Sequence, residues 1–198
     1  MTRRRRQGPR GLTLIELLVV IALLGTILAL GAPSMFDYIR LQRLKSISAQ
    51  LTTDLQFARS RAIGRDFYSF VLFPTETTLR CYTIYELPPL ADSMKHRCDC
   101  TRGPGSACNG TAGTELRTVV LSPDSGVHME ITGRNTGFGF DPVTGGLVSN
   151  KDDKLPKPLE EIVIDTVLDS KRTLRTTIGS AGSPTVCALS PNLGVPTC

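Results

Sequence analysis

The chain is poor in histidine and lacks several sequence motifs that build catalytic or metal sites. It contains no tryptophan and only two histidines, His96 and His128. There is no Gly-x-x-x-x-Gly-Lys phosphate loop and no paired Cys-x-x-Cys zinc motif. Ser122, Ser125 and His128 could suggest a hydrolase, but polar residues beside a turn explain them more simply. We therefore predict a protein that is not an enzyme and that carries no cofactor and no metal.

An excess of basic residues over the body of the chain is also absent. The formal net charge is +5, with 23 basic and 18 acidic residues. Five of the basic residues lie before Gly11: Arg3, Arg4, Arg5, Arg6 and Arg10. Without this leader, 18 basic residues balance 18 acidic ones, so the broad basic surface of a nucleic-acid-binding domain is missing.

One small basic cluster could still contact phosphate groups. It consists of Lys171, Arg172 and Arg175, with no acidic residue between Asp169 and the end of the cluster. A charged hairpin tip is the simpler explanation, and binding through phosphates would fall steeply with salt. We interpret the cluster as a weak nucleic-acid contact at most.

A long apolar run follows the basic leader. Residues 12–30 contain a single charge, Glu16, and a helix of this length spans roughly 28 Å, enough to cross a bilayer core. Basic residues before such a run hold the N-terminus in the cytoplasm. A simple uncleaved anchor would explain the run and the arginines, but not a carboxylate in an apolar segment.

The stretch Arg10-Gly11-Leu12-Thr13-Leu14-Ile15-Glu16 resembles the class III signal of type IV pilins and type II secretion pseudopilins. The resemblance implies that a prepilin peptidase cleaves between Gly11 and Leu12 and methylates the new N-terminus. Glu16 becomes the fifth residue of the mature chain, where the family uses it to dock onto the N-terminal amine of a neighbouring subunit. Pro33 matches a proline that kinks the helix in many pilins, whereas Leu12 departs from the usual phenylalanine.

The rest of the chain predicts one helix followed by a β-rich domain. Apolar and small residues recur at steps of three and four, which is typical of one helix face that packs on a core. This stripe consists of Leu41, Leu44, Ser48, Leu51, Leu55, Ala58 and Ala62. Charged residues, Asp54 among them, are expected on the other faces, and Gly64 is expected near the helix end.

Short β-rich segments separated by turn signals follow the helix. We predict strands at Phe67–Phe73, Thr78–Tyr85, Leu116–Leu121, Val127–Ile131, Gly137–Phe140, Ile162–Leu168 and Thr173–Ile178. The expected fold is α+β: the type IV pilin fold, with a long N-terminal helix packed on an antiparallel β-sheet or small β-sandwich.

These patterns divide the chain into four parts. The resemblance implies that residues 1–11 form a cleaved leader and 12–33 a transmembrane and filament-core helix, followed by its amphipathic half at 34–66 and a periplasmic β-rich head at 67–198. Within the head, residues 87–115 are rich in Gly, Pro, Ser and Cys and predict an irregular insertion.

All the cysteines lie beyond the apolar run: Cys81, Cys98, Cys100, Cys108, Cys187 and Cys198. An even number on that side of a membrane indicates disulfides in an oxidising compartment. We expect Cys187 and Cys198 to close a loop at the tail and the other four to pair among themselves.

Two stretches resemble one branch of the pilins, the GspH/FimT/FimU group: LTTDLQFARSRAIGRD (51–66) and GRNTGFGFDPVTGGLV (133–148). The resemblance implies a minor pilin of a type IV pilus in a Gram-negative bacterium, held in the inner membrane and then assembled into the pilus. Its partners would be the prepilin peptidase, other minor pilins, the major pilin and a tip adhesin.

Two alternatives remain within the family. One is the equivalent minor pseudopilin of a type II secretion system, because the two groups overlap in sequence. The other is a pilin that captures DNA during natural transformation. Such pilins carry a Gly-Arg-x-Arg motif near the C-terminus, and the corresponding residues 179–183 here are Gly-Ser-Ala-Gly-Ser, without arginine.

Overall fold

The computed structural model describes residues 11, 13–75, 79–88, 97–132, 137–149, 156–191 and 193–198. The chain forms two compact units, Met1–Ile39 and Arg40–Cys198, and each is described by itself. We call them the small unit and the large unit. One long helix and nine strands are described, which confirms the predicted α+β class.

The helix α1 extends from Leu14 to Arg65 and continues through Gly31 and Pro33. Proline removes one amide donor, but its fixed φ is compatible with helical geometry. The kink at Pro33 stays a prediction. The helix ends at Arg65 because Asp66 adopts a left-handed conformation (φ 57°), which Asp tolerates better than most residues.

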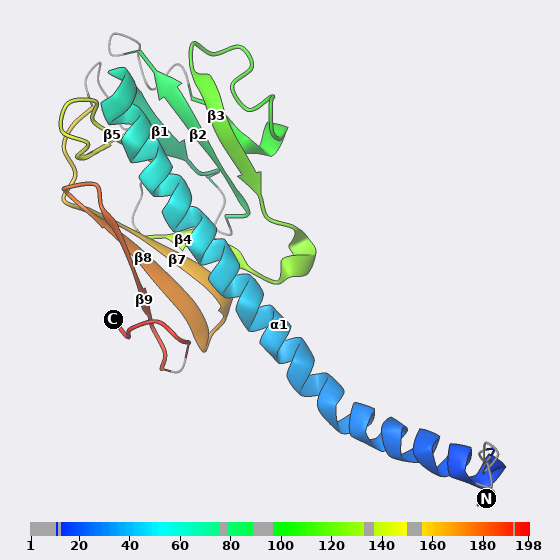
Figure 1. Ribbon diagram of the computed structural model, residues 1–198. Helices are drawn as coiled ribbons and strands as arrows, with labels where there is room; N and C mark the ends of the chain where they lie inside the picture. The colour runs from blue at the N-terminus through cyan, green and yellow to red at the C-terminus, as the bar shows by residue number, and fades with distance from the viewer. Residues whose placement is uncertain are drawn as a thin grey trace, which may run out of the picture. The chain divides into compact units, whose positions relative to one another are not determined.

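The strands form two antiparallel sheets, coloured by position in the chain in Figure 1. The five-stranded sheet has the order β3-β2-β1-β5-β6. Its strands are β1 (Tyr68–Leu72), β2 (Cys81–Leu87), β3 (Thr114–Val120), β5 (Gly137–Phe140) and β6 (Leu147–Ser149). The four-stranded sheet has the order β4-β7-β8-β9. Its strands are β4 (His128–Ile131), β7 (Glu161–Asp169), β8 (Arg172–Gly179) and β9 (Pro184–Ala188).

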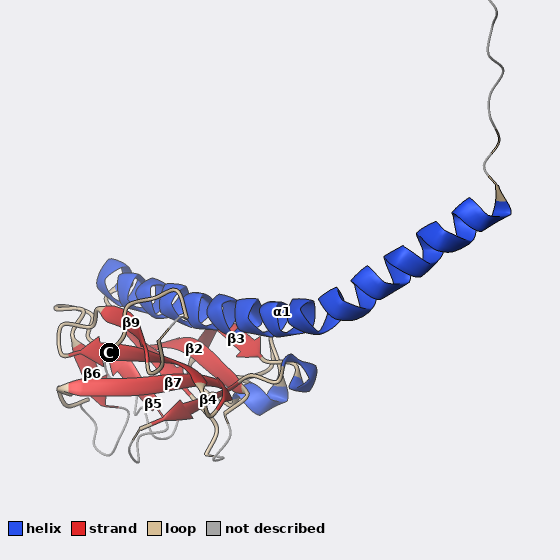
Figure 2. Cartoon of the chain, turned by 90° about the horizontal axis from the view of Figure 1, so that it is seen from below, coloured by secondary structure: helices blue, strands red, loops and turns tan. Residues whose placement is uncertain are grey.

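The later half of α1 packs along one face of the strands (Figure 2). Leu51, Leu55, Ala58 and Ala62 are fully buried, in one cluster with side chains of both sheets. Closer to the start of the large unit, Leu44 packs with residues of the four-stranded sheet and the C-terminal tail. The predicted stripe is thus the side of the helix that joins the two sheets into one core.

The five-stranded sheet is covered on both faces. Val71 and Ile84 point to the core beneath α1, whereas Phe70 and Tyr85 point to a second cluster on the opposite face. Cys98, Ala107 and Cys108 belong to that second cluster. The described part of the Cys-rich insertion therefore forms a covering layer, which explains why every residue of β2 is buried.

Seven strands were predicted near their observed positions, and β6 and β9 were missed. A segment of three residues such as β6 is too short to show alternation. The segment that forms β9 begins with Pro184, and proline argues against a strand in sequence analysis. Two short 3₁₀ helices, η1 (Cys100–Arg102) and η2 (Pro123–Ser125), were also not predicted.

Asp54 departs from the predicted pattern. It was expected on a solvated face of the helix, but it is 1% exposed. The Tyr82 hydroxyl donates a hydrogen bond of 2.7 Å to its Oδ2, and Arg117 Nη1 lies 2.6 Å from its Oδ1. Because both carboxylate oxygens have partners, the charge is tolerated inside the core.

Candidate functional site

Glu16, the predicted docking residue, caps the helix on which it lies. The backbone N–H and the hydroxyl of Thr13 each donate to Glu16 Oε2 at 3.1 Å, and the Glu16 N–H donates to Thr13 Oγ1 at 3.3 Å. The Leu17 N–H donates to the Thr13 carbonyl oxygen, which begins the helical hydrogen bonding. These contacts are a capping box, in which Ser or Thr and a Glu three residues later satisfy each other's backbone donors.

The capping role of Thr13 was not anticipated, although the signal is present in the sequence. Thr-x-x-Glu directly before an apolar run is the usual pattern of a capping box. The carboxylate of Glu16 therefore has hydrogen-bond partners in its own chain, and among the residues that the structure describes none of these partners is a cation. Of the predicted cleavage pair, Gly11 is exposed, and Leu12 lies outside the described residues together with the five leader arginines.

The small unit presents large apolar side chains to its surroundings. Residues of α1 from Leu14 to Leu28 and from Met35 to Tyr38 include many that are more than half exposed. Within the part of the chain that the structure describes, no helix combines the length and the apolar character needed to cross a membrane. The predicted span begins at Leu12, outside the described residues, and stays a prediction.

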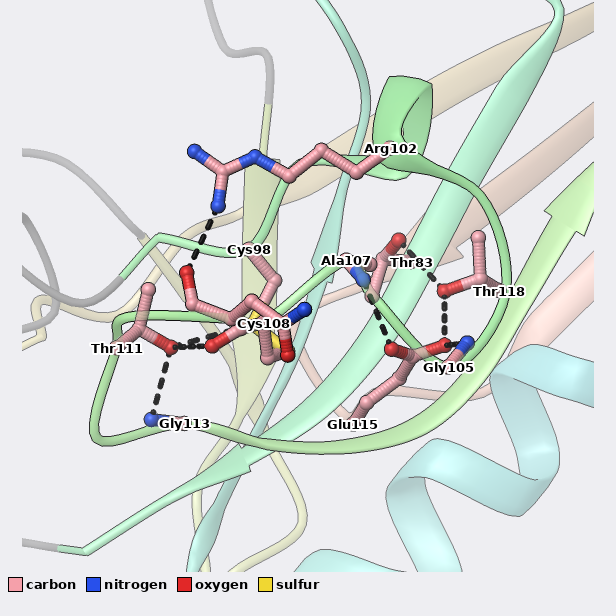
Figure 3. The surroundings of a disulfide bond; sticks show 11 residues. Thr83, Cys98, Arg102, Gly105, Ala107, Cys108, Thr111, Gly113, Glu115 and Thr118 are labelled. Atoms are coloured by element: carbon pink, nitrogen blue, oxygen red, sulfur yellow. Dashed lines mark hydrogen bonds between the residues drawn. A yellow bond between two sulfur atoms is a disulfide. The ribbon is translucent and has the colours of Figure 1, made fainter.

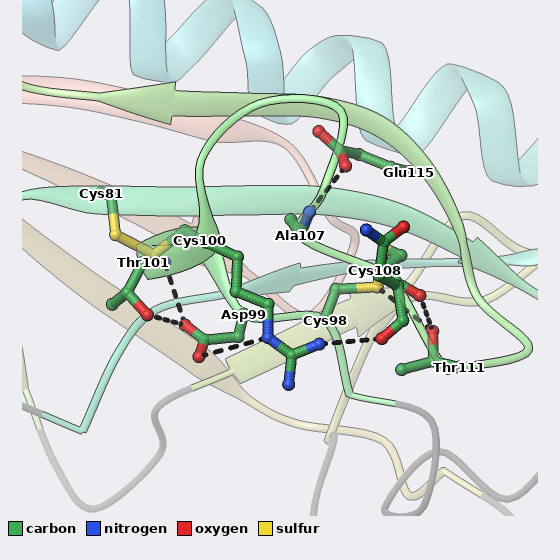
Figure 4. Close-up of polar contacts among 11 residues, drawn as sticks. Cys81, Cys98, Asp99, Cys100, Thr101, Ala107, Cys108, Thr111 and Glu115 are labelled. Atoms are coloured by element: carbon green, nitrogen blue, oxygen red, sulfur yellow. Dashed lines mark hydrogen bonds and ion pairs between the residues drawn. A yellow bond between two sulfur atoms is a disulfide. The ribbon is translucent and has the colours of Figure 1, made fainter.

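All six cysteines form disulfides. Cys187 pairs with Cys198 at the tail, and the other two disulfides are Cys81–Cys100 and Cys98–Cys108. The tripeptide Cys98-Asp99-Cys100 thus sends one disulfide to the start of β2 and one within the insertion (Figure 4). Asp99 caps η1 by accepting hydrogen bonds from the Thr101 N–H and hydroxyl.

Glu115 on β3 fixes the described part of the insertion (Figure 3). Its carboxylate accepts hydrogen bonds from the N–H groups of Gly105 and Ala107 at 2.8 and 3.0 Å. It also accepts one from Thr118 Oγ1 at 2.7 Å. Partial burial acts to raise the pKa of Glu115, but these donors together outweigh it and lower the pKa. The loop is therefore ordered by a charged residue as well as by disulfides.

The predicted basic cluster is largely occupied by ion pairs. Arg175 makes two hydrogen bonds to Asp165, at 2.9 and 2.8 Å. Arg172 pairs with Asp169 through Nε and Nη2, at 2.7 and 2.6 Å. Phosphate binding by either arginine would have to compete with a carboxylate that is already bound, which weakens the nucleic-acid interpretation.

Ser125 and His128, which could suggest a hydrolase, form hydrogen bonds with residues that are close to them in sequence. Ser125 Oγ donates to the Ser122 carbonyl oxygen at 2.7 Å, within η2. His128 Nε2 lies 3.2 Å from Glu130 Oε1, on the same strand. Among the described residues, no group of three or more His, Cys, Asp or Glu side chains could hold a metal ion.

The N-terminal segment matches a known sequence family. The model of the prokaryotic N-terminal methylation motif matches residues 6–32, which include Gly11, Leu12 and Glu16. No match was found among curated proteins.

Two solved structures resemble the chain, and both are crystal structures of the type IV minor pilin FimU of Pseudomonas aeruginosa PAO1. The P21 crystal form is 17% identical over 73% of this chain and 88% of that chain, with a TM-score of 0.51. The P65 form is 16% identical over 72% and 90%, with a TM-score of 0.49. At this identity the likeness shows the fold: α1 packed on antiparallel sheets is the type IV pilin fold, as predicted. The methylation motif and the fold together confirm the predicted resemblance to the type IV pilin group that includes FimU.

Proposed function

We propose that the protein is a minor pilin: a structural subunit that joins other minor pilins in a tip or priming complex and links that complex to the major pilin. The observation that carries this proposal is the methylation motif joined to a FimU-like fold. The pilins it resembles are structural subunits, and we infer the same role here, without catalysis. The match to a pilus protein favours the pilus over the secretion pseudopilus, and the paired arginines of β8 speak against DNA capture.

The proposed life cycle begins in the inner membrane. The prepilin peptidase cleaves between Gly11 and Leu12 and methylates Leu12, and the large unit faces the periplasm. Assembly then moves the apolar part of α1 from lipid into the filament core. Glu16 docks onto the N-terminal amine of a neighbour, and a buried carboxylate of this kind sets register more than stability.

The capping box allows the docking charge to be separated from the helix cap. In Glu16→Gln the side chain still caps, because Gln serves at this position of a capping box, but its charge is gone. In Thr13→Ala the charge remains and the cap is lost. We expect Glu16→Gln to reduce the amount of this protein in sheared pili by at least about tenfold, the effect of about 1.4 kcal/mol.

Thr13→Ala should reduce pilus incorporation much less, and Glu160→Ala, which removes an exposed carboxylate of the large unit, should not reduce it at all. Membrane levels of each variant are measured in parallel to exclude degradation. Wild-type incorporation of Glu16→Gln would refute docking through this charge.

A further inference from the structure

The large unit contains a pocket of about 250 Å³ walled by arginines. Arg40 and Arg43 reach it from α1, and Arg172 reaches it from the start of β8. Asp124, Ser125 and Asp169 complete the polar lining. We call this site the arginine pocket.

The three guanidinium groups differ in how far their charge is compensated. Arg172 is held in place by Asp169. Arg43 Nη1 donates to the Asp124 carbonyl oxygen at 3.3 Å, a neutral acceptor that leaves its charge in place. Arg40 forms no hydrogen bond or ion pair with any residue that the structure describes. Arg172 is already paired with Asp169, so Arg40 and Arg43 face one further carboxylate in the lining, that of Asp124, and this excess of positive charge favours an anion.

The residues directly before the pocket in sequence are apolar and exposed. Met35, Phe36 and Tyr38 are 58%, 65% and 57% exposed, and Ile39 is bonded directly to Arg40. Aromatic residues followed by cations are typical of the boundary between lipid and water. Anionic phospholipid headgroups attract basic side chains that lie within a few ångströms of the membrane surface.

We propose that the arginine pocket binds the phosphate group of an anionic phospholipid before the subunit is assembled. The inference rests on the proposed function, because the subunit meets lipid only if it is stored in a membrane. Planar guanidinium groups match the geometry of phosphate oxygens and bind them bidentately. A carboxylate of a neighbouring protein could also bind the positive charge of the pocket. That alternative would not explain why the residues immediately before Arg40 are apolar and exposed.

The test is native mass spectrometry of the full chain in mild detergent with equal amounts of phosphatidylglycerol and phosphatidylcholine. The wild type should retain phosphatidylglycerol preferentially. Arg40→Gln and Arg43→Gln should each lower that retention by about fivefold, and the double variant should lose the preference. Arg80→Gln is the matched control, because Arg80 is an exposed arginine outside the pocket. Circular dichroism verifies that each variant is folded.

Three results would overturn the proposal. The double variant could retain phosphatidylglycerol like the wild type, or millimolar inorganic phosphate could displace the lipid, which would identify a site for free phosphate. As a third result, the double variant could lose co-purified pilins together with the lipid while wild-type retention does not depend on the lipid headgroup, which would identify a protein contact. The same spectra report whether the chain begins at Leu12, so a failure of pilin processing is detected separately from a failure of lipid binding.

Discussion

At the scale of single residues, buried polar groups attach the helix to the sheet. Asp54 on α1 contacts Tyr82 on β2 and Arg117 on β3. About two helical turns further along, Arg61 pairs with Glu86 of β2 at 2.9 Å. Burial, and then the bond to Asp54, raise the pKa of Tyr82. The phenol therefore stays protonated at all ordinary pH values and acts as a permanent donor.

Replacing Tyr82 by Phe tests how much this hydroxyl donor contributes to stability. The ring still fills its site, but one oxygen of a buried carboxylate loses its partner, so we expect the free energy of unfolding to fall by about 1–3 kcal/mol. Urea titration of the full chain in detergent measures it. Tyr38→Phe removes an exposed hydroxyl and is the control. An equal effect in both variants would contradict this role for Tyr82.

Glu115 predicts a dependence of stability on pH. Its pKa in the folded protein lies below the ordinary value of about 4.3. Its contribution is therefore fully present above that value and is lost as the pH falls through the folded pKa. Glu115→Gln should be less stable than the wild type at pH 7, and the difference should shrink below about pH 4.

Thermal unfolding at a series of pH values measures the difference in stability between the wild type and Glu115→Gln. Asp99 and Asp169 also have a lowered pKa, but they are the same in both chains and cancel in the comparison. Glu160→Gln, at an exposed site, should track the wild type throughout. If this difference in stability stayed constant with pH, the charge of Glu115 would not be what orders the insertion.

At the scale of elements, the β7–β8 hairpin presents an inward face that is mostly apolar. Ile162, Ile164, Leu174 and Ile178 contribute to the core from this face. Thr166 and Thr176 lie on the same face, fully buried, and their hydroxyls have no hydrogen-bond partner. A buried hydroxyl without a partner costs free energy, whereas a methyl group of the same size does not.

Thr166→Val should therefore stabilise the protein, by up to about 1 kcal/mol. The shape of the side chain is kept and the unsatisfied oxygen is removed. Calorimetric melting of the full chain should show a higher Tm. Thr177→Val, on the outward side of β8, should leave Tm unchanged; a lower Tm for Thr166→Val would reveal that a bound water satisfies the hydroxyl.

At the scale of the whole molecule, the charge is concentrated in the segment that we propose is removed. The full chain has a pI near 9.0, and the chain that begins at Leu12 is formally neutral. Cleavage should shift the pI to near neutral, and isoelectric focusing with intact mass measures it on protein from cells with and without the prepilin peptidase. A mature species that remains basic would contradict cleavage after Gly11.

Much of the architecture was predictable because it depends on local periodicity. The helical stripe and seven strands follow from spacing along the chain, and the methylation motif was predicted from the resemblance of residues 10–16 to prepilin signals. The burial of Asp54 was not predictable, since its partners lie 28 and 63 residues away. The arginine pocket was missed for the same reason: Arg40 and Arg172 meet only after β7 and β8 have folded against α1.

The pairing of Cys81 with Cys100 has a consequence for how the protein is made. In the topology that we propose, the large unit is exported with its N-terminal side first, so Cys98 would reach an oxidising compartment before Cys100 does. An oxidase that joins cysteines in order of arrival would link Cys81 to Cys98, a pair that the fold does not contain. The native bonds then require exchange by thiolate attack on the first disulfide. Correct maturation should therefore depend on a disulfide isomerase as well as on an oxidase.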